Sequence, residues 1–120
     1  MEEIVQPMLE FRNQIKLYHW KTDSYARHKA TCKYIELFDE KTDQFIEVLI
    51  GSRGKKVSSN FTIKFKNVID KNATGHVEKF REWVRDTLPT LLHEHETDLL
   101  NLKDELLADL NRLLYLFKLQ

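Results

Sequence analysis

Four stretches of this chain carry apolar residues at steps of three and four, and this spacing predicts four amphipathic helices. Only three glycines and two prolines occur in 120 residues, so the composition is rich in helix-compatible residues. The sequence therefore predicts one all-α domain over residues 1–120. The apolar positions of the four stretches are Ile4, Met8, Phe11, Ile15 and Tyr18; Tyr25, His28, Cys32, Ile35, Phe38, Phe45, Ile46 and Leu49; Val77, Phe80, Val84, Leu88 and Leu91; and Leu99, Leu102, Leu106, Leu110, Leu113 and Phe117.

Capping residues mark the ends of the first two predicted helices. The first helix runs to about residue 21, and Asp23 or Ser24 can cap the second. The second continues as far as residue 50, where Gly51 and Gly54 stop it. At the standard rise this second helix is about 40 Å long.

The third and fourth predicted helices differ in regularity. The third begins near residue 72 or 74 and contains Pro89, which should kink or split it near Thr87 because proline lacks a backbone donor. The fourth opens at Thr97 and Asp98, an N-cap followed by a first-turn acid, and its leucine stripe is the most regular in the chain.

The lengths of the connections predict how the helices pack. Two or three residues join the first helix to the second, and the third to the fourth, so each pair should form an antiparallel hairpin. Residues 52–72 are long enough to span a bundle, which predicts a ferritin-like four-helix bundle with a long crossover between helices 2 and 3. Within the crossover, residues 61–66 alternate apolar and polar side chains, which fits an extended segment or a short helix equally well.

Composition excludes several classes of protein. With 19 basic and 19 acidic residues the net charge is zero, so no global field attracts the chain to nucleic acid or to an anionic membrane. No apolar run approaches the roughly 20 residues that a membrane span needs, and no signal peptide is recognisable. The single cysteine, Cys32, fits a reducing compartment such as the cytoplasm and is expected to be a buried small hydrophobic residue.

Four metal-capable side chains lie in the first fifty residues, at His19, His28, Asp43 and Glu47. On one continuous helix, the 15 residues from His28 to Asp43 correspond to about 22 Å. One chain therefore cannot close a site from all four. An antiparallel two-fold neighbour would bring the acidic end of one copy against the histidine end of the other, twice per dimer. The spacing predicts a metal site shared between subunits.

The residues that carry a family resemblance are Tyr18, His19, Trp20, His28, Asp43, Glu47 and Gly51. Together they resemble the Dps mini-ferritins, in which a His-Trp pair precedes a second His by a short turn and an Asp-x-x-x-Glu follows fifteen residues later. The short form His-Trp-x-Thr-x-Ser-Tyr-x-x-His, beginning at His19, is similar to small ferritin-like proteins of phages and large DNA viruses. The resemblance covers residues 5–51 well and the fourth helix loosely.

The resemblance implies an iron-binding protein with ferroxidase and iron-sequestering activity, assembled through two-fold contacts into a homo-oligomer or a closed shell. It implies His19, Asp43 and Glu47 as primary ligands, with His28 holding a second or bridging ion. Imidazole and carboxylate ligands suit Fe(II), and also Mn or Zn. A viral source would place the protein in the host cytoplasm.

Three features depart from the Dps pattern. His19 and His28 stand nine residues apart, about three fewer than in that family. Cys32 occupies a position where Dps proteins commonly carry an acidic ligand, and there is no Lys-rich tail of the kind that holds DNA. The Glu-x-x-His repeat of di-iron sites inside single bundles is also missing, which favours the intersubunit alternative.

Other interpretations of the same residues stay open. His28 and Cys32 could hold zinc as an i, i+4 pair, and the run from His93 to Glu96 fits exposed capping residues better than a metal cluster. The chain could also be a metal-free helical interaction or structural protein. A third possibility is a nucleic-acid-associated protein that uses the basic crossover, which carries Arg53, Lys55, Lys56, Lys64, Lys66 and Lys71 against only Asp70.

Overall fold

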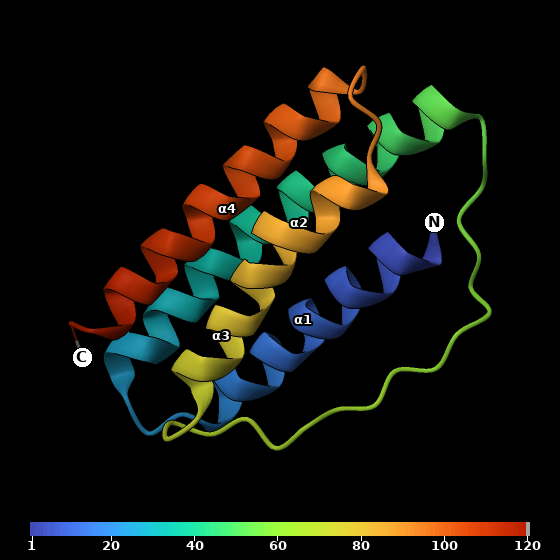
Figure 1. The fold of residues 1–120 in the computed structure, drawn as a ribbon. Helices are drawn as coiled ribbons and strands as arrows, with labels where there is room; N and C mark the ends of the chain where they lie inside the picture. Colours follow the sequence, from blue (N-terminus) through green and yellow to red (C-terminus); the bar gives the residue numbers. More distant parts are fainter. Residues whose placement is uncertain (120) are drawn as a thin grey trace.

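The computed structural model describes residues 1–119, which form four α-helices and no β-strand (Figure 1). The prediction of an all-α fold is therefore confirmed. No helix in this range is both long and apolar enough to cross a membrane. The helices are α1 (Glu2–Lys21), α2 (Tyr25–Arg53), α3 (Ala73–Glu82) and α4 (Thr97–Phe117), and α3 continues into a π-helical turn, η1 (Trp83–Thr87), and a 3₁₀ turn, η2 (Leu88–Leu91).

The helices pack as two hairpins joined by a long connection. α1 and α2 are antiparallel, as are α3 and α4, and residues 54–72 carry the chain back across the molecule (Figure 1). Of the two conformations predicted for residues 61–66, the extended one is present. This connection runs parallel to α1, because residues 62, 66 and 67 contact residues 6, 14 and 21 in that order.

Gln14 attaches the connection to α1. Its side chain is only 1% exposed, and its amide forms two hydrogen bonds with the backbone of Lys66. Gln14 Nε2 donates to the Lys66 carbonyl oxygen at 2.7 Å, and the Lys66 amide donates to Gln14 Oε1 at 2.8 Å. One side chain thus satisfies the donor and acceptor that a neighbouring β-strand would otherwise pair.

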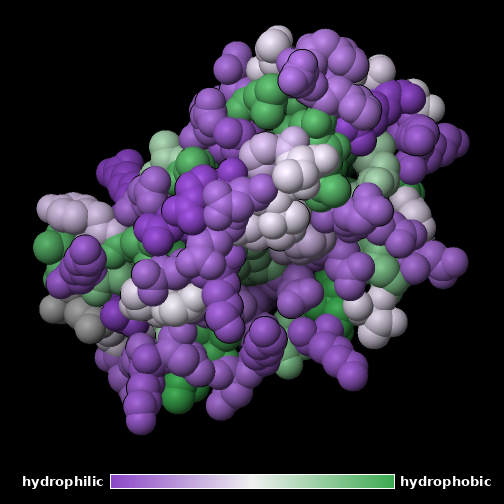
Figure 2. All heavy atoms as spheres, viewed as in Figure 1, coloured by the Kyte–Doolittle hydropathy of each residue, from purple (hydrophilic) through white to green (hydrophobic). Residues whose placement is uncertain are grey.

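The core lies where the inward stripes of all four helices meet. Phe11 is at its centre, with its ring stacked on Phe80 at a centroid distance of 3.9 Å and edge-on to Phe38 at 5.9 Å. Burying one such side chain contributes about 1.5–3 kcal/mol to stability. On the face seen in Figure 2, hydrophilic side chains predominate and apolar ones form separate patches.

Several predicted helix ends are observed. Ser24 caps α2, its hydroxyl accepting a hydrogen bond from the Arg27 amide at 3.2 Å. The third helix changes geometry at residue 83 and again at Leu88, beside Pro89, so the predicted split near Thr87 is confirmed. The π turn absorbs the hydrogen-bond mismatch ahead of the proline.

Two predicted ends are wrong. Gly51 lies inside α2, and only Gly54, which takes the left-handed conformation at φ 65°, ends that helix. Thr97 is the first residue of α4, and Glu96 occupies the N-cap position in its place. The Glu96 side chain forms no capping hydrogen bond with α4, because it points inward and pairs with Arg53.

The prediction that Cys32 is buried is also wrong, because its side chain is exposed. The inward positions at the start of α2 are taken by Arg27, Thr31 and Tyr34. Cys32 follows Thr31 by about 100° around the helix and so faces away from the core. His28 and Tyr25, assigned to the same apolar stripe, are likewise exposed.

The ion pair between Arg53 and Glu96 joins the end of α2 to the start of α4. Glu96 is 3% exposed and accepts two hydrogen bonds from the Arg53 guanidinium, at 2.7 and 3.0 Å. It also accepts from the His93 amide at 2.8 Å. The hydrogen bonds from Arg53 are the main reason why the pKa of Glu96 falls to about 2.

We predict that Glu96→Gln lowers the free energy of unfolding by about 1–3 kcal/mol at pH 7, because the half-buried Arg53 guanidinium loses its charged partner. The contribution of Glu96 is complete above its unfolded pKa of about 4.5 and is lost as the pH falls toward 2. Urea denaturation of both proteins at pH 7 and pH 3 measures this, with exposed Asp104→Asn as control. If the free energies of unfolding of the wild type and Glu96→Gln differed by the same amount at both pH values, the ion pair would not be the source of the stability.

Candidate metal centre

The two histidines of the predicted site meet at the α1–α2 turn. His19 lies in the last turn of α1 and His28 in the first turn of α2, and their rings stack at a centroid distance of 3.9 Å with 14° between their planes. His19 is buried and His28 is exposed. The sequence therefore identified a pair that the fold brings into contact.

Hydrogen bonds fix the tautomer of His28. Its Nδ1 lies 2.9 Å from the backbone carbonyl oxygen of His19. A carbonyl oxygen only accepts, so Nδ1 must carry the proton. In the neutral ring the lone pair is therefore on Nε2.

The same reasoning applies to His19, through Thr31. The Thr31 hydroxyl lies 2.8 Å from the Arg27 carbonyl oxygen and 2.9 Å from His19 Nδ1. When it donates its one proton to that carbonyl, its shortest contact, its oxygen accepts from His19 Nδ1–H, and His19 then also has its lone pair on Nε2. Within residues 1–119 no protein group forms a hydrogen bond with Nε2 of either ring. Thr31 was not singled out from the sequence, because its role depends on contact between two helices.

The surroundings of His19 favour its neutral form. Burial lowers the pKa of His19 below its usual value, and the neighbouring charges of His28 and Lys16 lower it further. A neutral imidazole is the form that ligates a metal ion. Its surroundings thus hold His19 in a ligand-competent state at neutral pH.

A polar network around buried Tyr18 and Arg27 fixes the turn that carries these rings. Tyr18 donates to Asp70 at 2.7 Å, and Arg27 donates to the Tyr18 hydroxyl at 3.0 Å. Arg27 also donates to the Phe117 carbonyl oxygen at 3.4 Å and lies over the Phe117 ring. The hydroxyl of Thr22 and the backbone amide of Asp23 donate to the same Asp70 carboxylate, and these bonds lower its pKa.

The two carboxylates lie far from the histidines on the same chain. Asp43 and Glu47 are exposed on the C-terminal half of α2, which is continuous from residue 25 to 53. His28 and Asp43 are therefore about 22 Å apart along that helix. Fifteen residues rotate the helix by only about 60° beyond whole turns, so both face a similar direction. Within residues 1–119 no group of three or more metal-capable side chains comes together.

Asp43 and Glu47 border a groove between α1 and α2. The groove has a volume of about 530 Å³, and its lining includes Val5, Met8, Leu9, Ile46 and Val57. The ion pair of Arg12 with Asp39 at 2.9 Å bridges the two helices at its side. The α1–α2 hairpin thus carries imidazoles at one end and carboxylates beside an apolar groove at the other.

The remaining candidates occupy different surroundings. His93 and His95 are exposed and stack on each other at 5.4 Å, while Glu96 is committed to Arg53. The expectation of exposed capping residues is therefore met only in part, because Glu96 takes the N-cap position but is buried and forms no side-chain capping hydrogen bond with α4. His28 and exposed Cys32 remain an i, i+4 pair, and the zinc interpretation of that pair stays a prediction.

A family model described as a family of unknown function (DUF5856) matches residues 19–117, a range that includes all four candidate ligands. No curated protein and no solved structure matches the chain.

We predict that both imidazoles of the metal-free protein carry their proton on Nδ1, and that His19 titrates below pH 6.5. Long-range proton–nitrogen NMR spectra identify each tautomer, with the exposed ring of His95 as an internal reference. Thr31→Val should remove the preference at His19 and leave it at His28. An Nε2-protonated His28 would contradict the assignment.

Proposed function

We propose that this chain, which belongs to the family of unknown function DUF5856, binds Fe(II) at a site shared between two subunits and oxidises it, in the manner of a mini-ferritin. His19 and His28 come from one subunit, and Asp43 and Glu47 come from the other. The observation that carries the proposal is the pair of imidazoles, both held with an Nε2 lone pair available.

The fixed tautomers support a metal-binding role. Histidines that ligate metals commonly donate their other N–H to a carbonyl oxygen or another acceptor, which orients the ring. His19 and His28 have such acceptors in Thr31 and in a backbone carbonyl. Two rings that only pack against each other would not need a hydrogen bond from each Nδ1 to fix their orientation.

The ring geometry favours two ions over one. An imidazole holds its metal near the plane of the ring, and the planes here are 14° from parallel. Two nearly parallel planes share no nearby point, so the pair cannot chelate a single ion. Each ring would hold its own ion, at a separation resembling the roughly 3.5–4 Å of two-metal sites.

The acidic pair supplies the complementary charge. Asp43 and Glu47 lie one turn apart on the same helix face, so each of the two ions can receive one carboxylate. Nitrogen and oxygen ligands without a thiolate suit Fe(II), with Mn and Zn as alternatives. Each pair alone is an incomplete coordination sphere, which is why a second subunit is required.

The outer face of α1 and α2 supports a two-fold contact. Leu9 and Trp20 are 43% and 66% exposed, and they lie eleven residues apart on α1, within about 20° of the same direction. Exposed large apolar side chains of this kind are typical of interfaces. In an antiparallel dimer, Trp20 of one copy approaches the groove beside Asp43 and Glu47 of the other. Because Trp20 follows His19 in the chain, this contact also brings the imidazoles of the first copy toward the carboxylates of the second.

The topology is consistent with the same proposal. Two antiparallel hairpins joined by a long connection between the second and third helices resemble the arrangement of ferritin-like bundles. Iron is the substrate here. Two Fe(II) ions give two electrons to one molecule of hydrogen peroxide, which takes up two protons and leaves as two water molecules.

We predict that His19→Ala with His28→Ala, and Asp43→Ala with Glu47→Ala, each abolish Fe(II) oxidation. When the two inactive variants are mixed and reassembled, activity should return to about one quarter of the wild-type rate. Half of the dimers are then mixed, and each mixed dimer holds one intact site of two. The near-ultraviolet ferric signal after anaerobic Fe(II) loading measures the rate.

The matched control is Glu78→Ala with Glu82→Ala, an i, i+4 acidic pair on α3 that should leave the rate unchanged. Wild-type activity in the Asp43 and Glu47 variant would overturn the ligand assignment. Failure of the mixture to recover activity would overturn the shared site. A wild-type chain that neither binds nor oxidises Fe(II) would identify a metal-free interaction protein.

A second candidate function is contact with phosphate groups of nucleic acid. Lys66, Lys71 and Lys79 line a hollow of about 320 Å³ at the start of α3. His76 lies beside them, and its Nε2 is buried without a hydrogen-bond partner in the described part of the chain. Burial and the two nearest lysines, Lys66 and Lys79, lower the pKa of His76. This cluster adds Lys79, which the crossover pattern alone did not include.

If this second function holds, Lys66→Glu with Lys71→Glu should weaken binding of a duplex DNA at low salt by about tenfold or more. Lys55→Glu with Lys56→Glu makes the same charge change in the connection, away from the hollow, and should have a smaller effect. A mobility-shift titration measures both. Equal losses in the two variants would contradict a specific site.

A further inference from the structure

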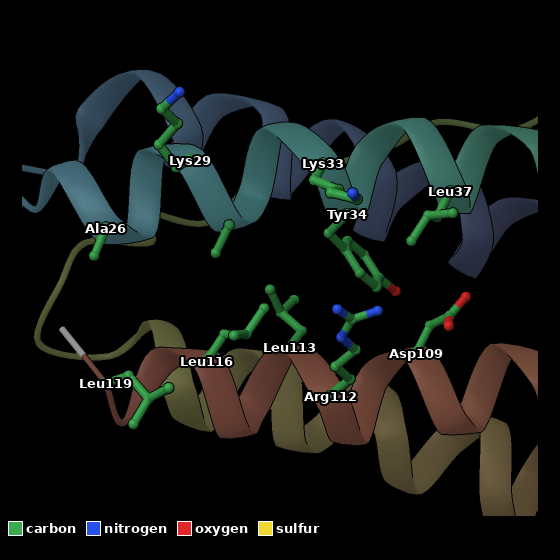
Figure 3. Close-up of a pocket in the computed structure, with 11 residues that line it drawn as sticks. Ala26, Lys29, Lys33, Tyr34, Leu37, Asp109, Arg112, Leu113, Leu116 and Leu119 are labelled. Carbon is green, nitrogen blue, oxygen red and sulfur yellow. The ribbon is translucent and has the colours of Figure 1, made fainter.

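A second groove lies between α2 and α4 and belongs to no part of the proposed iron site (Figure 3). Its volume of about 300 Å³ is at the lower end of the range for small-molecule sites. The α2 side is formed by Ala26, Ala30, Tyr34 and Leu37, and the α4 side by Leu113, Leu116 and Leu119. The small side chains of Ala26 and Ala30 leave the space open between the helices.

The groove has one apolar end and one polar end. Ala26, Leu116 and Leu119 lie at one end, where Lys29 directs its amine away from α4, and Tyr34, Asp109 and Arg112 lie with Leu37 at the other (Figure 3). Leu119 follows Arg112 by seven residues and lies just beyond the end of α4 at Phe117, so the two residues lie at opposite ends of the groove. A ligand that fits this groove is therefore elongated and carries its polar group at one end.

Tyr34 presents an unused hydrogen-bond donor to the polar end. The residue is 5% exposed, its hydroxyl points into the groove, and it forms no hydrogen bond with any residue between 1 and 119 (Figure 3). Burial, with the nearby charge of Asp109, raises the pKa of Tyr34 well above its usual value. The hydroxyl therefore keeps its proton and can donate it to an anion.

The charges at the polar end are predominantly positive. Asp109 is neutralised by Lys41, whose Nζ lies 2.6 Å from its carboxylate. Arg112 and Lys33 line the groove, and neither is part of an ion pair within the described residues. A guanidinium is well suited to hold a carboxylate through two parallel hydrogen bonds.

We infer that this groove binds a medium-chain fatty carboxylate. The alkyl chain lies against the leucines of α4 and the alanines of α2, and the carboxylate accepts hydrogen bonds from Arg112 and Tyr34. Lys33 adds positive charge at the opening. The site is independent of the iron site, because it uses the side of α2 that faces α4.

Titration calorimetry with decanoate tests this inference on the wild-type protein. Binding should be saturable at one site per chain, and decanol, which has the same tail without the charge, should bind at least tenfold more weakly. Arg112→Gln should weaken decanoate binding tenfold or more and leave decanol binding unchanged. Tyr34→Phe should weaken decanoate binding by about threefold to tenfold.

Two further variants separate the groove from the rest of the molecule. Ala26→Phe places a ring at the exposed rim of the apolar end and should abolish binding while the circular dichroism spectrum stays helical. Lys103→Gln removes a cation elsewhere on α4 and should leave binding unchanged. Decanoate affinity that is equal in wild type and Arg112→Gln would overturn the inference. A decrease in solution mass on adding decanoate would also overturn it, because it would show that a second copy of the chain occupies the groove when decanoate is absent.

Discussion

The contact of Arg27 with Tyr18 and Asp70 is the interaction on which the rest of the structure depends. It joins the turn between α1 and α2, the end of the connection and, through Phe117, the end of α4. Three segments that are distant in sequence therefore meet around one guanidinium. Because a buried charge is costly unless its partners are in place, this end of the bundle has one favourable arrangement. That arrangement also sets the separation of the two histidine rings.

The helices could be predicted because apolar spacing reports directly on burial. The stripes on α1 and α4 are buried as expected, and the short turns and the cap at Ser24 follow from local chemistry. Cys32 was misassigned because the core-facing direction at the start of α2 is set by Arg27, a residue that a hydrophobicity pattern treats as external. Gly51 was misassigned for a related reason, since a glycine ends a helix only where the backbone takes a positive φ, as at Gly54.

The candidate site was predictable in its residue types and only partly in its geometry. The separation of nine positions from His19 to His28 indicated a turn that could bring the rings together, and they do stack. The roles of Thr31 and of the His19 carbonyl could not be inferred, because a tautomer is decided by partners across the helix interface. Tyr34 and Arg112 were missed for a similar reason, since a groove between α2 and α4 depends on which pair of helices leaves space.

Gln14 holds the long connection through backbone atoms alone. Every residue type has the same amide and carbonyl, except that proline lacks the donor. The side chain at position 66 therefore has little effect on how the long connection is attached to α1, whereas the side chain at position 14 is essential to it. The outward side chains of the connection can therefore change during evolution, and with them whatever this surface binds, while the helices beneath the connection stay the same.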